Sequence, residues 1–202
     1  MDQTRGAILV DKLKETIIVD DLIPTELQDE IENILMNYPN WRFVKDMSYA
    51  NYDMEYPSYG FNMMFKHPEH GIVSPLYERL SVPIANAILK KRLIRFEDIN
   101  FNRAFLQLPL AEKFLKENNG IHIDLPEDHY ACVYYVNDSD GDTIVYEQTR
   151  YNTECGSQNV PLTEHKRVTP KKGRLVIFDG ARFHCSSQPK NAYRCIINFD
   201  FI

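Results

Sequence analysis

The amino-acid sequence predicts a mainly β fold with helices flanking it. In the second half, short runs rich in β-branched and aromatic residues alternate with turn segments rich in Gly, Asn, Asp and Pro. In the first half, two segments repeat their apolar residues at the spacing of a helix face. Hydrophobic residues make up 44% of the 202 residues and charged residues 26%, which suits a chain that buries a core and argues against disorder.

The first elements are a strand and a helix. Residues 16–19, Thr-Ile-Ile-Val, are typical of a β-strand. A helix is expected to begin at Pro24 and Thr25, because Pro is favoured in the first helical turn and Thr25 with Gln28 matches a capping box. The apolar residues that share one face of this helix are Leu27, Ile31, Ile34 and Leu35.

A second helical region begins near Ser74 and Pro75 and restarts at Pro83. Its apolar stripe consists of Ile84, Ile88 and Leu89. We expect both helices to pack on the outside of the β core, so that residues 1–98 form a support layer.

An aromatic-rich segment lies between the two helices. Residues 38–65 hold nine of the 24 aromatic residues (one Trp, 12 Tyr and 11 Phe). We expect Trp41, Phe43, Phe61 and Phe65 to pack in strands and core. The tyrosines of residues 49–59 are interleaved with polar and turn residues, which is typical of a loop over a pocket mouth. This stretch is therefore a candidate lid.

Residues 99–202 are expected to form the β core, and the whole chain, residues 1–202, a single domain. Turn signals separate the strand-like runs, among them Asn118-Asn119-Gly120 and residues 137–142. The predicted strands are residues 130–136, 143–146, 174–178, 183–185 and 193–201.

Composition limits the setting in which the protein works. No apolar run reaches membrane-spanning length, and the N-terminus lacks a basic region leading into an apolar segment, so we expect a cytoplasmic protein. The net charge of -6 argues against a nucleic-acid partner, and the basic residues 166–174 are interpreted as a solvated edge. Cys132, Cys155, Cys185 and Cys195 show no paired framework and are expected to be thiols.

The most informative pattern is His122-Ile123-Asp124 followed much later by His184. Two imidazoles and one carboxylate can bind one face of a six-coordinate Fe(II) and leave the other positions open. We expect His122 and Asp124 on a strand, because residues two apart point to the same side, while Ile123 faces the opposite layer. A histidine by itself is more often a surface or core polar residue than a ligand, so the prediction depends on the combination.

Arg194 is the second unusual residue. It lies in a run whose neighbours are mostly apolar, Tyr-Arg-Cys-Ile-Ile-Asn-Phe. A buried charge needs a partner, and a dicarboxylate cosubstrate is one that a guanidinium can bind with two hydrogen bonds. Tyr135 is a further candidate, although packing in the core explains it equally well.

The order of these elements resembles the double-stranded β-helix core, a jelly-roll of cupin-like type, of the 2-oxoglutarate- and iron(II)-dependent dioxygenases, nearest their prolyl-hydroxylase-like branch. The resemblance covers about half of the chain. The matching elements, in order, are His122-x-Asp124, residues 134–137, residues 140–143, Pro170-x-x-Gly173 before a strand that ends at Phe178, His184 and Arg194.

The resemblance implies that His122, Asp124 and His184 bind the catalytic iron, and that Arg194 and Tyr135 bind the distal carboxylate of 2-oxoglutarate. It also implies O2-dependent hydroxylation of a substrate, with release of succinate and CO2. A peptide or protein side chain is the favoured substrate class, ahead of a free amino acid, a small metabolite or a nucleobase. The chain departs from the family at residues 140–143, Asp-Gly-Asp-Thr rather than Gly-Gly-Glu-Thr, and at Arg194, where many prolyl hydroxylases have Lys.

Two alternatives remain from the sequence: a non-catalytic jelly-roll binding module, and a Zn(II)-dependent hydrolase on the same fold. Arg194 argues against both, since neither needs a buried cation opposite the metal. The other histidines carry less weight. His67-Pro68-Glu69-His70 is interpreted as a loop, and His129 and His165 as solvated residues beside charges.

Overall fold

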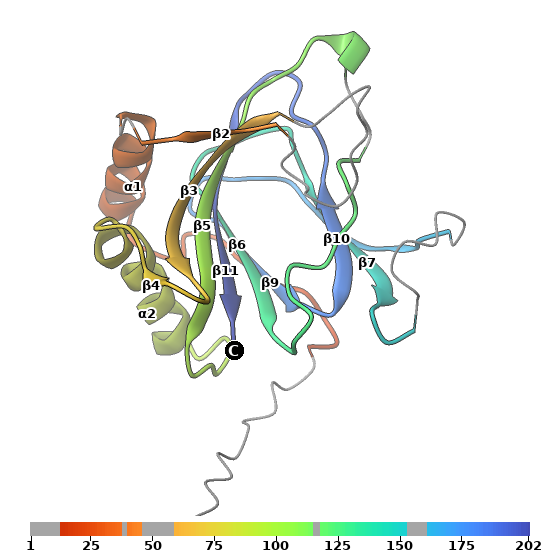
Figure 1. Cartoon of the computed structure of the whole chain (residues 1–202), viewed down its shortest axis with the longest axis horizontal. Coiled ribbons are helices and arrows are strands. Elements are labelled where there is room, and N and C mark those ends of the chain that lie inside the picture. The colour runs from red at the N-terminus through yellow and green to blue at the C-terminus, as the bar shows by residue number, and fades with distance from the viewer. Residues whose placement is uncertain (1–12, 38–39, 46–58, 115–117, 153–160) are drawn as a thin grey trace, which may run out of the picture.

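The computed structural model describes residues 13–37, 40–45, 59–114, 118–152 and 161–202. Two antiparallel sheets face each other, and two helices cover the outer face of the larger sheet (Figure 1). The predicted mainly β fold with flanking helices is confirmed. Every strand pairing in both sheets is antiparallel.

The larger sheet has eight strands in the order β1-β9-β6-β11-β5-β3-β2, with β4 paired to β3. Its central strands come from distant parts of the sequence, because β11 lies between β5 and β6. The bounds are β1 (Ile17–Val19), β2 (Arg42–Val44), β3 (Gly60–His67), β4 (Gly71–Ile72), β5 (Ile99–Gln107), β6 (Tyr130–Tyr135), β9 (Leu175–Asp179) and β11 (Arg194–Phe201).

The smaller sheet has three strands in the order β10-β7-β8. They are β7 (Thr143–Thr149), β8 (Glu164–Val168) and β10 (Arg182–Ser186). The pairing of β10 with β7 is irregular between Arg182 and His184, whereas His184 itself pairs with Val145. The smaller sheet therefore carries one of the predicted metal ligands.

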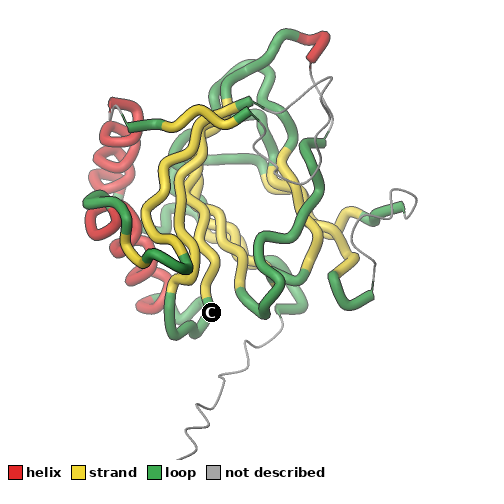
Figure 2. Tube along the Cα trace, viewed as in Figure 1, coloured by secondary structure: helices red, strands yellow, loops and turns green. Residues whose placement is uncertain are grey.

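The helices are α1 (Thr25–Asn37) and α2 (Val82–Lys90), the latter preceded by the π-helical turn η1 (Tyr77–Ser81); a short 3-10 turn, η2 (Glu112–Phe114), follows β5. Both helices lie on one side of the sheet (Figure 2). As predicted, Ile31 and Leu35 of α1 and Ile84 and Ile88 of α2 are fully buried, but Leu89 is 44% exposed and lies off the packed face. In the described part of the chain, no helix is both long and apolar enough to cross a membrane.

The predicted capping box does not form, because Thr25 is already the first helical residue. The Gln28 amide instead donates a hydrogen bond to the carbonyl of Ile23 at 2.8 Å. The same amide lies against the backbone of Gly173, where a Cβ would come within 2.4 Å of it. Gly173 also has a φ of +77°, so glycine suits this turn both in conformation and in space.

The central strands are apolar on both faces because both faces are covered. Along β6, Cys132 and Tyr134 belong to the core on the helix side, whereas Ala131, Val133 and Tyr135 belong to a second cluster between the two sheets. This double burial explains the continuous apolar run in the sequence, which would alternate with polar residues in a sheet with one solvated face. Both faces of the central strands of the larger sheet are thus core.

The aromatic segment divides between core and surface. Phe65 is fully buried, and the Trp41 indole donates to the carbonyl of Leu35 at 2.8 Å. Phe43 is 58% exposed and stacks on Tyr59, so the prediction that it packs in the core is wrong. Its strand, β2, lies at the edge of the larger sheet, where fewer of the described residues surround a side chain. Residues 46–58 lie outside the described residues, so the lid remains a prediction.

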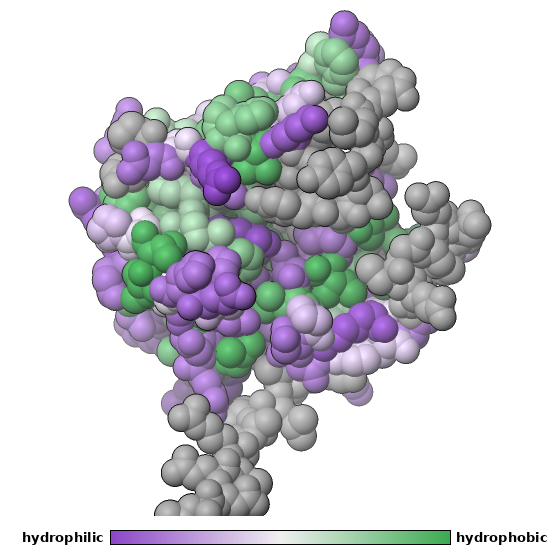
Figure 3. Space-filling model, viewed as in Figure 1, coloured by the Kyte–Doolittle hydropathy of each residue, from purple (hydrophilic) through white to green (hydrophobic). Residues whose placement is uncertain are grey.

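The surface agrees with the charged composition. The space-filling view shows mainly hydrophilic residues on the described part of this face, with smaller hydrophobic groups between them (Figure 3). Cys132, Cys185 and Cys195 are buried free thiols, as expected, while Cys155 lies outside the described residues.

Candidate metal centre

His122 and His184 are brought together by a short backbone bridge. Each of the two residues donates its N–H to the carbonyl of the other, both at 3.0 Å. Asp124 follows in a bend, so the predicted strand at His122 and Asp124 is reduced to this single bridge. Ile123 packs with the apolar cluster on the other side of the smaller sheet, as expected. Strand β10 and the connection before β6 therefore position all three side chains.

The three predicted ligands converge. The Nε2 atom of His184 lies 3.1 Å from Oδ2 of Asp124, and Nε2 of His122 lies 3.7 Å from Oδ1 of Asp124. The donor atoms all lie within 4.8 Å of one another. Metal–ligand bonds of about 2.1 Å at right angles place neighbouring donors roughly 3 Å apart, so these side chains fit one face of a metal ion.

Both imidazoles are held in the form that binds metals. The Nδ1 atom of His122 faces the carbonyl of Gly120 at 2.8 Å, and Nδ1 of His184 faces that of Arg182 at 3.1 Å. A carbonyl accepts only, so Nδ1 of each ring carries a proton, and Nε2 of each ring faces Asp124. Burial, and then the charge of His184, lowers the pKa of His122 to about 4.

The Asp124 carboxyl is ionised at neutral pH. Burial by itself would raise the pKa of this carboxyl, but the hydrogen bond and charge of His184, followed by the charges of Arg103 and His122, outweigh burial. The pKa therefore lies well below its ordinary value. Two imidazoles and a carboxylate are the donor types that a divalent ion of this kind binds.

Arg194 is a buried cation without an acidic partner among the described residues, none of whose carboxylates lies within ion-pair distance. Only 4% of the residue is exposed. The guanidinium donates to neutral oxygens instead: the carbonyl of Gly141 at 2.8 Å, Oε1 of Gln107 at 3.1 Å and Oγ1 of Thr143 at 2.9 Å. Burial lowers the pKa of Arg194, yet a guanidinium stays charged in proteins, so a carboxylate ligand would complete this site.

Arg194 lies close to the metal ligands along β10. Its partner Gln107 donates to Oγ of Ser186 at 3.4 Å, and Thr143 pairs with Ser186 across the smaller sheet. Ser186 is two residues beyond His184, and two residues of a strand span roughly 6.6 Å on one face. The cation and the metal triad are thus separated by about the length of a small dicarboxylate.

Tyr135 is fully buried and lies beside Arg194, with its ring centre 5.9 Å from the guanidinium carbon. Its hydroxyl donates to the carbonyl of Val168 over 3.4 Å, a long hydrogen bond. Burial raises the pKa of Tyr135 to about 12, so the hydroxyl keeps its proton at neutral pH. Its predicted contact with a cosubstrate carboxylate remains a prediction.

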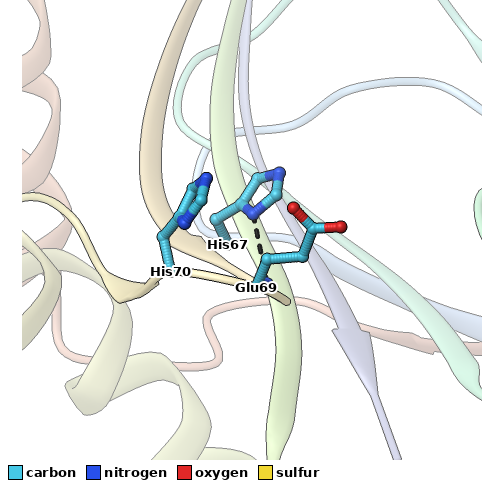
Figure 4. A group of neighbouring side chains, drawn as sticks. All are labelled: His67, Glu69 and His70. Carbon is cyan, nitrogen blue, oxygen red and sulfur yellow. Dashed lines mark hydrogen bonds between the residues drawn. The ribbon is translucent and has the colours of Figure 1, made fainter.

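A second group of metal-binding residue types lies on the turn after β3. His67 and His70 stack with ring centres 4.8 Å apart, and Nδ1 of His67 accepts the backbone N–H of Glu69 (Figure 4). Figure 4 shows the Glu69 carboxylate and the His70 ring on opposite sides of His67. Their donor atoms also lie within 4.8 Å of one another, but Glu69 and His70 are exposed, and the turn that follows His67 agrees with the predicted loop.

His129 is buried, contrary to the prediction that it is solvated, because it lies beside Asp124 and Asp200 in the interior. Its Nε2 atom is 3.8 Å from Oδ1 of Asp200, which is also fully buried. Burial lowers the pKa of His129; burial and then the charge of Asp124 raise the pKa of Asp200 well above its ordinary value. His165 is half-buried and pairs with Glu147 at 2.8 Å.

Two charged residues near the site were missed by sequence reasoning, Asp200 and Arg103. Asp200 lies in the same apolar run as Arg194, so a charge within a buried strand was a usable signal for both. Strand alternation places the two on the inner face of β11 with Ile196. Arg103, on β5, gave no comparable signal because its neighbours are mixed.

No family model and no curated protein matches the sequence. Solved structures do match. One is an oxidoreductase of the 2OG-Fe(II) oxygenase family from Burkholderia pseudomallei (14% identity, 92% of this chain and 84% of that chain, TM-score 0.60). Another is a prolyl-4-hydroxylase from Pseudomonas putida (15%, 92% and 91%, TM-score 0.55). A third is the epimerase SnoN with Fe3+, alpha ketoglutarate and nogalamycin RO (11%, 93% and 78%, TM-score 0.59). The fold is that of the 2OG-Fe(II) oxygenases, as the sequence resemblance implied.

Proposed function

We propose that the protein is an Fe(II)- and 2-oxoglutarate-dependent dioxygenase. The observation that carries the proposal is a convergent triad, His122, Asp124 and His184, within one strand segment of a buried arginine that lacks an acidic partner. A metal-binding module would need only the triad. A dicarboxylate cosubstrate that spans metal and guanidinium accounts for both features.

Each residue has a separate task. His122, Asp124 and His184 would hold the metal, and Arg194 would bind the distal carboxylate of 2-oxoglutarate, with Tyr135 as a second donor. Bound iron supplies the O2 activation that couples decarboxylation of 2-oxoglutarate to oxidation of a substrate. The apolar cluster between the sheets excludes water, and the Phe178 ring packs edge-on against His184 at 4.9 Å.

For the substrate, we propose a peptide or protein side chain that becomes hydroxylated. The similarity to a prolyl-4-hydroxylase favours this class, while the similarity to SnoN, crystallised with nogalamycin RO, keeps a small molecule as the alternative. The chain departs from the prolyl-hydroxylase pattern at residues 140–143 and at Arg194. These departures weaken the case for a prolyl substrate more than the case for hydroxylation.

The test is anaerobic addition of Fe(II) and 2-oxoglutarate to the metal-free protein, followed by visible absorption. We expect a weak charge-transfer band only when both are present. Asp124→Ala should lose the band and Fe(II)-dependent succinate formation while remaining folded, because the change removes a ligand without opening a large core cavity. Glu127→Ala is the matched control, since this exposed carboxylate lies three residues away and outside the triad.

A wild-type protein that binds Fe(II) but gives no band with 2-oxoglutarate would contradict the proposal and favour the binding module. Hydrolytic turnover with Zn(II), without any requirement for 2-oxoglutarate, would favour the hydrolase. Undiminished succinate formation by Asp124→Ala would exclude this triad as the metal site.

A further inference from the structure

Arg103, on β5, is the residue that distinguishes the two oxygens of Asp124. Its Nη2 donates to Oδ1 of Asp124 at 2.8 Å, whereas Oδ2 lies 3.1 Å from Nε2 of His184. The two side chains are 12% and 3% exposed, so this ion pair is largely shielded from solvent. Oδ1 is therefore engaged by a guanidinium and lies 3.7 Å from Nε2 of His122, whereas Oδ2 has the shorter contact with an imidazole of the triad.

The Arg103 guanidinium is fixed in place. It lies over the ring of Phe101 at 4.2 Å and over that of Phe105 at 4.9 Å. These residues are two positions before and after Arg103 on the same strand, so all three side chains share the inner face. Planar guanidinium groups stack well on aromatic faces, and this arrangement holds the hydrogen-bonding edge toward Asp124.

Within the described part of the chain, the polar contacts of Arg103 are confined to Asp124. Among the described residues, Asp124 is the single hydrogen-bond acceptor of its guanidinium, and Nε is buried without a partner. A residue that served only to join two segments would be expected to use more of its five donors. The contacts are directed at one carboxylate oxygen.

We infer that Arg103 is a positioning residue that keeps Asp124 a one-oxygen ligand, through Oδ2. Carboxylates bind metal ions through one oxygen or through both. The charge-assisted hydrogen bond from Arg103 occupies Oδ1 and removes the second mode. Three of about six coordination positions are then used by the protein, and the remaining three suffice for 2-oxoglutarate, which takes two, and O2. This inference rests on the proposed function.

The experiment uses Mn(II) as the probe metal, so that it does not depend on turnover. Water-proton relaxation of the Mn(II)-loaded protein counts the metal-bound waters, and calorimetry gives the affinities for Mn(II) and then for 2-oxoglutarate. We expect about three bound waters in the wild type and about two in Arg103→Leu, in which Asp124 can bind through both oxygens. The affinity of the loaded variant for 2-oxoglutarate should fall by roughly 10–100-fold.

Arg103→Lys should retain the wild-type water count, because an ammonium can still donate to Oδ1. Arg79→Leu is the matched control, as it removes an arginine paired with Glu30 on the helix side of the sheet. Thermal unfolding of each metal-free variant shows whether it is folded before the metal is added.

The possible outcomes separate this inference from the proposed function. If the wild type binds Mn(II) and 2-oxoglutarate and Arg103→Leu keeps about three waters, the inference is overturned while the proposed function stands. If Arg103→Leu is folded but binds no Mn(II), Arg103 is needed to form the site rather than to limit Asp124, and the inference is also overturned. If the wild type binds no metal, both the proposed function and this inference are overturned.

Discussion

At the scale of single residues, the candidate ligands are held in place before any metal arrives. His122 and His184 are oriented by backbone carbonyls, Asp124 by Arg103, and His184 also by the ring of Phe178. Burial makes this arrangement sensitive to protons, since a buried imidazole resists the charge that it would accept in water.

The metal-free protein should therefore lose stability in mild acid. The folded-state pKa of His122 is lowered from 6.5 to about 4, so between these values the unfolded chain takes up a proton that the folded chain does not. The free energy of unfolding should fall as pH decreases through this window, by up to about 1.4 kcal/mol per pH unit from this group. The contribution of ionised Asp124 is lost only at lower pH, because its folded-state pKa is depressed.

Urea unfolding at pH 7, 6 and 5 measures this effect, and His122→Gln should show a shallower dependence on pH. Some dependence should remain, since burial lowers the pKa of His129 in the same direction. Parallel pH profiles for the two proteins would contradict the prediction.

Arg194 should decide the affinity for the cosubstrate. Arg194→Met removes a guanidinium that can make two charge-assisted hydrogen bonds, worth about 2–4 kcal/mol. We expect 2-oxoglutarate affinity to weaken by some thirty- to several-hundredfold at about tenfold per 1.4 kcal/mol, with Fe(II) affinity much less changed. Lys should rescue in part, because a point charge cannot reproduce the planar fork.

Calorimetric titration of 2-oxoglutarate into the Mn(II)-loaded protein measures this loss. The variant also leaves Gln107 and Thr143 without their donor, so its thermal unfolding serves as the control for folding. If Arg194→Met binds 2-oxoglutarate as tightly as the wild type does, the result contradicts the prediction and favours the non-catalytic binding module.

At the scale of elements, the turn between β9 and β10 sets the position of His184. Gly180 donates its N–H to the carbonyl of His129 at 2.9 Å, and its backbone packs directly on the His129 ring. A Cβ at this position would lie 2.3 Å from Nε2 of His129. The strand that carries a ligand thus depends on a close approach that only glycine allows.

Gly180→Ala should destabilise the protein by about 1–3 kcal/mol, because either the turn or the buried ring must move. Chemical denaturation of Gly180→Ala, His129→Ala and the double variant measures whether the two positions are coupled. In the His129→Ala background the cost of the added methyl group should be much smaller. If the losses of unfolding free energy in the two single variants simply add up in the double variant, the methyl group does not press on the His129 ring, and the prediction is wrong.

At the scale of the whole molecule, the candidate site lies between the two sheets, beside the apolar cluster that they share. His184 belongs to the smaller sheet, whereas Arg103 and Arg194 belong to the larger one. The apolar cluster between the sheets is smaller than the core on the helix side. Ligands that contact both sheets should therefore stabilise the fold as a unit.

We expect Mn(II), and then 2-oxoglutarate, each to raise the unfolding temperature. At a hundred times the dissociation constant, a ligand contributes about 2.7 kcal/mol, which for a chain of this size corresponds to roughly 5–11 °C. Scanning fluorimetry measures both increments. Asp124→Ala should lose both and Arg194→Met only the second; equal shifts in Asp124→Ala would mean that the ligands bind outside the candidate site.

The sequence by itself determined the mainly β fold and the residues of the candidate site. Continuous apolar runs indicate strands whatever their partners, and a charge or imidazole that interrupts such a run is visible without coordinates. Arg194 was predicted in this way, whereas His122, Asp124 and His184 were predicted from the His-x-Asp and His pattern and its order among the strands.

Only the tertiary structure decided what those residues contact. The pairing of Arg103 with Asp124 and the burial of His129 beside Asp200 depend on which strands become neighbours and which face is covered. The exposure of Phe43 and Leu89 has the same origin, because their local patterns are those of packed residues. A local sequence pattern indicates which side chains favour burial. The residues that contact such a side chain, and the layer that covers it, come from segments far away in the sequence.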